Sequence, residues 1–181
     1  MARKTAFLAA DKTTKMNILY LHGLESKLNP AKRKVLERFG KVLAPEIDYG
    51  SAYLQPERIL NAIPDTEINV VMGSSMGALN AYAISDLIGR PALLFNPPLG
   101  KYGNPGPAPE YIPKYIRTST FKQLLLGGSD EVVDPAATLA YLGNRLQKEE
   151  LHLSIDPKLG HRIPLQLFEE QVSSFFSRLC Y

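Results

Sequence analysis

The sequence predicts an α/β fold with a mainly parallel sheet of about six strands and helices on both faces. Short apolar runs alternate along the 181 residues with segments of helical periodicity, which is typical of strand-helix units. The run INVVM (68–72) is almost continuously apolar and indicates a strand that is buried on both faces. Since crossovers between parallel strands are right-handed, such a chain forms a doubly wound sheet.

Each expected strand is a short apolar run that ends at turn residues. These runs are NILYL (17–21), KVLAP (41–45), INVVM (68–72), PALLFNPPL (91–99), LHLSID (151–156), and one strand within FKQLLLGGSD (121–130).

The segments between these runs have apolar residues at helical spacing. They are 30–40, 56–63, 76–89, 135–149 and 164–179. Pro30 is expected in the first turn of the first helix and Gly40 at its end, and Asp134 is expected to cap the fourth. The third helix is apolar nearly all round, which indicates a central position. The last helix is expected to face the core with Leu165, Phe168, Val172, Phe175 and Leu179.

Length and composition predict one globular domain over residues 17–181, preceded by an N-terminal extension, 1–16. The chain is 45% hydrophobic and 22% charged, and no apolar run approaches the roughly 20 residues that a membrane-spanning helix needs. The apolar stretch 6–10 is too short for the core of a signal peptide, so we expect the protein in the cytoplasm. The single cysteine, Cys180, excludes an internal disulfide and a cysteine-based metal site. We expect no metal and no organic cofactor.

Positive charge is concentrated near the N-terminus. Residues 1–41 contain ten Lys or Arg against three Asp or Glu, whereas the other residues contain eleven against fifteen. The cluster Lys32, Arg33 and Lys34 either attracts an anionic partner, such as a phosphorylated acyl carrier or a coenzyme A thioester, or is a solvated helix face. It has no interleaved aromatic residues of the kind that bind single-stranded nucleic acid, so no nucleic acid partner is expected.

The stretch GSSMG (73–77) has the pattern Gly-x-Ser-x-Gly between an expected strand and an expected helix. In this context the pattern indicates a nucleophile elbow with Ser75 at the strained turn. Gly73 and Gly77 are small because the chain passes close to itself on both sides of the serine. A phosphate loop or a dinucleotide loop would need a different glycine spacing.

A serine nucleophile needs a base, and His161 is the candidate because it follows the last strand in a loop. His152 lies inside an alternating strand, where a structural role is expected, and His22 precedes Ser75 in the chain. Asp130 directly follows the fifth strand and is the candidate acid that orients the histidine.

Three other carboxylates are alternative candidates for the acid. Asp134 is better explained as a helix cap, Asp156 is close in sequence to His161, and Glu131 is expected to face solvent.

The anion that forms during acyl transfer needs two backbone donors. The amide of Met76, directly after the candidate nucleophile, is one, and the amide of Leu24 in the loop LHGLES is the other. Gly23 allows the sharp turn there, and His22 is expected to orient the loop.

Together, Ser75, Asp130, His161 and the HGL loop resemble the α/β-hydrolase superfamily. The segments LYLHGLESK, GSSMGA, NPP, GGSDEVVD and GHR are similar to the small lidless bacterial serine esterases of about 180 to 200 residues. The resemblance implies a minimal α/β-hydrolase without a cap domain and without the first two strands of larger members. It implies the triad and the two oxyanion donors named above, and hydrolysis of short acyl esters or thioesters.

Two alternatives to a serine carboxylesterase or thioesterase stay open. One is an acyltransferase or a small-peptide hydrolase on the same triad, and the other is a hydrolase-like binding module with an idle triad. The substrate and the oligomeric state are not readable from the sequence. The long connector 100–116 is expected to be either a wall of the binding site or a plain surface loop. Its tyrosines, Tyr102, Tyr111 and Tyr115, either line the pocket or pack for stability.

Overall fold

The computed structural model describes residues 16–63, 65–101, 120–143 and 151–179. The chain order is β1 (Met16–Leu21), α1 (Pro30–Glu37), β2 (Gly40–Leu43), α2 (Pro56–Asn61), β3 (Val70–Ser74), α3 (Met76–Ile88), β4 (Ala92–Phe95), the 3₁₀ turn η1 (Leu99–Lys101), β5 (Lys122–Gly127), α4 (Pro135–Gly143), β6 (Leu151–Asp156) and α5 (Leu165–Leu179). The expected α/β architecture is confirmed.

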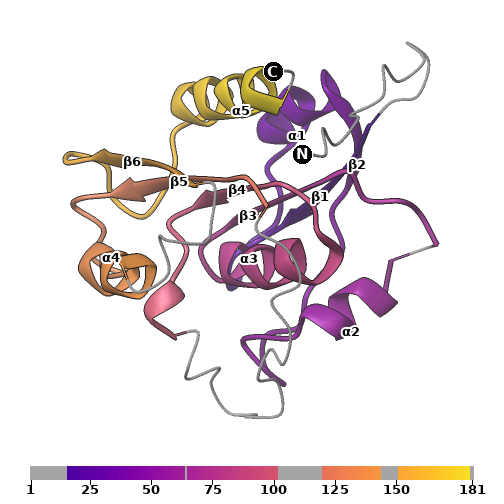
Figure 1. Cartoon of the computed structure of the whole chain (residues 1–181), viewed down its shortest axis with the longest axis horizontal. Coiled ribbons are helices and arrows are strands. Elements are labelled where there is room, and N and C mark those ends of the chain that lie inside the picture. The colour runs from indigo at the N-terminus through magenta and orange to yellow at the C-terminus, as the bar shows by residue number, and fades with distance from the viewer. Residues whose placement is uncertain (1–15, 64, 102–119, 144–150, 180–181) are drawn as a thin grey trace, which may run out of the picture.

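The six strands form one parallel sheet in the order β2-β1-β3-β4-β5-β6. Helices α1 and α5 cover one face of the sheet, and α2, α3 and α4 lie on the other (Figure 1). The strand order reverses between β1 and β3, because the chain first moves outward to β2 and then returns past β1. The loops that follow β1 and β3 therefore diverge, and a crevice at such a switch point is where open α/β sheets bind ligands.

Alternation along the central strands places a separate apolar core on each face of the sheet. In β1, Leu19 and Leu21 contribute to the core beneath α3, whereas Ile18 and Tyr20 contribute to the core beneath α1 and α5. Helix α3 is buried from Met76 through Asp86, which confirms its expected central position.

One ion pair lies inside the first of these cores. Lys122 at the start of β5 is fully buried, and its Nζ donates to Asp86 Oδ1 of α3 at 2.7 Å. The same Nζ lies 5.1 Å from the ring centroid of Tyr82 and donates to Thr120 Oγ1 at 3.3 Å. This buried ion pair stabilises the contact between α3 and the sheet. Removing either charge would leave the other unpaired in a medium of low polarity.

Two details of the sequence-based prediction are wrong. Gly40 does not end the first helix, which already ends at Glu37; it is the first residue of β2, opposite Met16. A Cβ at Gly40 would overlap the carbonyl of Met16, so glycine permits close strand approach there. Leu165 does not face the core: it is 43% exposed at the start of α5, while Phe176 joins the buried stripe.

Candidate active site

Ser75 forms a strained turn between β3 and α3. Its φ is 53° and its ψ is −125°, a backbone conformation that a residue with a side chain rarely adopts and that costs on the order of 1–3 kcal/mol. Hydrogen bonds on both sides of the serine hold this turn. Ser75 N–H donates to Phe95 O at 2.8 Å, and Ser75 O accepts from Ala78 N at 2.8 Å and Leu79 N at 3.2 Å.

The two glycines of the motif permit the tight packing around this turn. A Cβ at Gly73 would overlap the backbone of Gly77, and a Cβ at Gly77 would overlap the carbonyls of Leu21 and His22 at the end of β1. The start of α3 therefore lies directly against the end of the neighbouring strand. This contact brings the loop after β1 next to Ser75.

The loop after β1 is held by His22. A backbone N–H can only donate, so His22 Nε2 accepts from Ile47 N at 3.0 Å, and His22 Nδ1–H donates to Gly23 O at 2.7 Å. The Tyr49 hydroxyl donates to His22 O at 2.7 Å. These are the contacts that a loop-orienting role requires.

Gly23 brings this loop next to the elbow. A Cβ at Gly23 would lie 3.1 Å from Ser75 Cβ, which is closer than ordinary van der Waals contact. A residue with a side chain would therefore be crowded at this position. Leu24 follows Gly23 and is 45% exposed, and Met76 is the first residue of α3, where amides have no acceptor within the helix. Their role as oxyanion donors stays a prediction.

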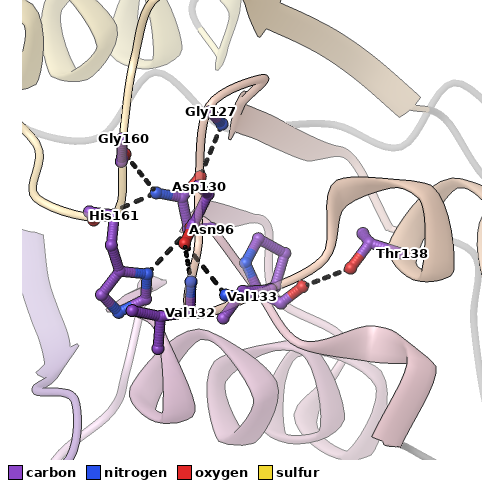
Figure 2. Close-up of polar contacts among 9 residues, drawn as sticks. Asn96, Gly127, Asp130, Val132, Val133, Thr138, Gly160 and His161 are labelled. Carbon is purple, nitrogen blue, oxygen red and sulfur yellow. Dashed lines mark hydrogen bonds and ion pairs between the residues drawn. The ribbon is translucent and has the colours of Figure 1, made fainter.

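The structure brings His161 and Asp130 into contact. His161 Nδ1 lies 2.8 Å from Asp130 Oδ2 (Figure 2). Asp130 Oδ1 accepts from the backbone N–H groups of Val132 at 2.8 Å and Val133 at 2.9 Å, and its side chain is 1% exposed. Since an ionised carboxylate only accepts, Nδ1 is the protonated nitrogen of a neutral His161, which leaves Nε2 able to take a proton.

Ser75 and His161 line one cavity of about 750 Å³, together with Gly23, Leu24, Tyr20 and Val132. Its volume is within the range of small-molecule sites, roughly 300–1,000 Å³. Burial raises the pKa of Tyr20 to about 12, against a smaller opposing effect of a hydrogen bond with Ser74, so the phenol is neutral. The candidate nucleophile and the candidate base thus lie in two different turns of the chain and line the same cavity, which is large enough for a small ligand.

Comparison with solved structures identifies the architecture. The chain is similar to a protein from Xanthomonas campestris pv. campestris assigned to the alpha/beta superfamily of hydrolases, at 21% identity and a TM-score of 0.68, covering 91% of this chain and 99% of that one. It is also similar to the Pyrococcus furiosus esterase Pf2001, at 16% identity and a TM-score of 0.63, covering 93% and 85%. The chain has the α/β-hydrolase fold.

A third similar structure is Zea mays acyl-protein thioesterase 2, at 16% identity and a TM-score of 0.61, covering 92% of this chain and 95% of that one. No family model and no curated protein matches the chain by sequence. Within the residues that the structure describes, this α/β-hydrolase fold has no cap domain over the sheet edge.

In this α/β-hydrolase fold, Asn96 contacts the loop that bears His161, and this role was not predicted from the sequence. Its Nδ2 donates to Gly160 O at 3.2 Å and to His161 O at 3.1 Å, and its Oδ1 accepts from Gly127 N at 2.7 Å (Figure 2). It is 2% exposed and has a φ of 47°. One side chain thus joins the ends of β4 and β5 to the loop that bears His161. The only sequence signal is an asparagine, a residue that tolerates positive φ, before Pro97.

The three alternative candidates for the acid have other surroundings: two accept hydrogen bonds from nearby backbone groups, and the third is exposed. Asp134 Oδ1 accepts from Ala136 N at 2.9 Å at the start of α4, as a helix cap does. Asp156 Oδ1 accepts from Lys158 N at 2.9 Å, and Glu131 is exposed.

His152 lies in β6 near Ser154 and Arg178, and burial and the Arg178 charge lower its pKa.

Several predicted features lie outside the described residues. They are the extension up to residue 15, the tyrosines Tyr102, Tyr111 and Tyr115 with the connector beyond Lys101, and Cys180. Across the described ranges, no three His, Cys, Asp or Glu side chains are grouped so that they could hold a metal ion. No helix in the described part of the chain has the length and apolar character needed to cross a membrane.

Proposed function

We propose that this chain is a serine hydrolase that cleaves small acyl esters or thioesters through an acyl-enzyme on Ser75. The observation that carries the proposal is one cavity lined by a serine on a strained strand-to-helix turn and by a histidine whose Nδ1 contacts a buried carboxylate. Strain of this kind is maintained at functional sites, where it exposes the reacting atom.

In the proposed reaction, Ser75 Oγ attacks the carbonyl carbon while His161 Nε2 takes its proton. Asp130 keeps the imidazole oriented and stabilises the imidazolium that forms. The amides of Leu24 and Met76 donate hydrogen bonds to the oxyanion. His161 then gives the proton to the departing alcohol or thiol, and water, deprotonated by the same nitrogen, releases the acid and restores Ser75.

The fold neighbours support the reaction class. One is named an esterase and another an acyl-protein thioesterase, and this chain has a similar fold. We propose residues 17–181 as the catalytic domain and 1–16 as an extension to it. Residence in the cytoplasm stays a prediction.

The test uses p-nitrophenyl esters of increasing acyl length, from acetate to dodecanoate. We expect wild-type protein to hydrolyse at least one of them, and Ser75→Ala to lose roughly 10⁴-fold or more of that rate. The adjacent serine provides the matched control: a fluorophosphonate probe should label the wild type and Ser74→Ala but not Ser75→Ala.

The same experiment separates the alternatives. Labelling of Ser75 without hydrolysis of any ester or thioester would shift the assignment to an acyltransferase or a peptide hydrolase. A folded wild type that neither reacts with the probe nor hydrolyses any ester would refute the proposal in favour of a binding module.

A further inference from the structure

The cavity beside Ser75 is unevenly charged. Of the described residues, three cations line it, Lys27, Lys32 and Arg162, against one carboxylate, Glu25. Lys27 already has a partner, because it forms an exposed ion pair with Glu46. Among the described residues, no carboxylate lies within 4.0 Å of the charged groups of Lys32 or Arg162. Two cations thus face the cavity with no counterion among the residues that the structure describes.

Lys32 is separated by its position from the other basic residues of α1. Arg33 approaches Glu37 and donates to Val42 O, and Lys34 is exposed away from the cavity lining. Lys32 is half-buried, with its Nζ 5.1 Å from the ring centroid of Phe168 in α5. The basic cluster seen in the sequence therefore does not act as one surface, because only Lys32 faces the candidate nucleophile's cavity.

Partial burial also lowers the pKa of Lys32. The ammonium group is held where water solvates it less well, and no carboxylate in the described part of the chain offsets that cost. A bound anion would supply the missing counter-charge and favour the protonated form. A lysine in this position therefore interacts with an anion more strongly than a fully solvated lysine would.

Arg162 is the second cation and lies in a different element. It directly follows His161 in the loop before α5 and is exposed at the cavity. Its guanidinium group presents donors in a planar fork that matches the oxygens of a carboxylate or phosphate. The candidate base and a free anion-binding group thus share one short loop.

We propose that Lys32 and Arg162 form an anion-binding subsite, so that the preferred substrate carries a carboxylate or phosphate group on its acyl chain or on its leaving group. This inference rests on the proposed hydrolase function of the same cavity. The two cations come from separate elements and line the same 750 Å³ space as Ser75, so an anion held between them keeps the rest of the molecule next to the serine.

Two matched substrate pairs test the subsite and distinguish the two positions of the anion. The acyl pair is mono-p-nitrophenyl glutarate and its methyl ester, which differ in one negative charge and one methyl group. The leaving-group pair is butyryl-coenzyme A and S-butyryl-N-acetylcysteamine, of which only the first carries phosphates. The readout is the ratio of kcat/KM for the charged to the neutral member, compared between wild type and variants so that intrinsic reactivity cancels.

For at least one pair, we expect Lys32→Met and Arg162→Gln each to lower this ratio about tenfold, mainly through a higher KM for the charged member. Lys34→Met, on the same helix but outside the cavity, should leave the ratio unchanged. Added salt should lower the wild-type ratio, since it screens exposed charges. Lys32→Gln serves as a second variant if the methionine disturbs the packing against Phe168.

Two outcomes separate this inference from the function on which it rests. Hydrolysis of the neutral esters with ratios that neither substitution changes would overturn the subsite and leave the hydrolase intact. If no substrate is hydrolysed, calorimetric titration of the wild type with glutarate and with coenzyme A replaces kinetics. Binding that Lys32→Met weakens would support the subsite without catalysis, whereas binding that this substitution leaves unchanged, or no binding at all, would overturn it.

Discussion

The substitution Asn96→Ala would remove the side-chain hydrogen bonds that join the ends of β4 and β5 to the loop bearing His161. It leaves the buried N–H of Gly127 without an acceptor, which costs about 1–3 kcal/mol. The carbonyls of Gly160 and His161 are only partly buried, so water replaces some of their loss. Alanine at a φ of 47° adds about 1–2 kcal/mol of backbone strain. We therefore expect the free energy of unfolding to fall by about 2–5 kcal/mol.

Urea unfolding followed by circular dichroism measures this change, with Asn96→Gly as the matched variant. Glycine loses the same hydrogen bonds but adopts the positive φ without strain, so it should be about 1–2 kcal/mol more stable than the alanine variant. Its folded form should still hydrolyse esters more slowly, because the loop that bears His161 has lost an anchor. An unfolding free energy for Asn96→Ala within about 1 kcal/mol of wild type would refute the reasoning.

Two further predictions concern the elbow and the buried ion pair. Gly77→Ala should abolish the native elbow and most soluble protein, because its Cβ would overlap backbone at the end of β1. Gly143→Ala is the control, since a Cβ at that position meets no atom of another described segment within 4 Å; it should be neutral or stabilise α4 by up to about 1 kcal/mol. Equal thermal stability of the two variants would contradict the packing argument. Lys122→Met should lower the free energy of unfolding by about 3–5 kcal/mol, and adding Asp86→Leu should restore much of this loss. A double variant no more stable than Lys122→Met would show that the unpaired Asp86 carboxylate is not the cause.

The sequence predicted the sheet and most helices because hydrophobic periodicity is a local property. Runs such as INVVM and the all-round apolar segment 76–89 have few alternatives to a buried strand and a central helix. Gly40 failed as a helix stop because glycine also marks close strand approach, and one residue type does not distinguish the two uses. Leu165 failed because helical spacing does not say where a helix extends beyond the core that it covers.

The sequence by itself determined which residues could serve the proposed site. Since the carboxyl ends of parallel strands meet at one sheet edge, chain order alone was enough to select Ser75, Asp130 and His161 as candidates. Only the tertiary structure decided that His161 contacts Asp130, that Asn96 anchors a loop 65 residues further along the chain, and that Lys32 rather than Arg33 or Lys34 faces the cavity. The reason is physical: each of these contacts depends on how distant segments pack and which way a side chain points, and no local pattern in the chain encodes either.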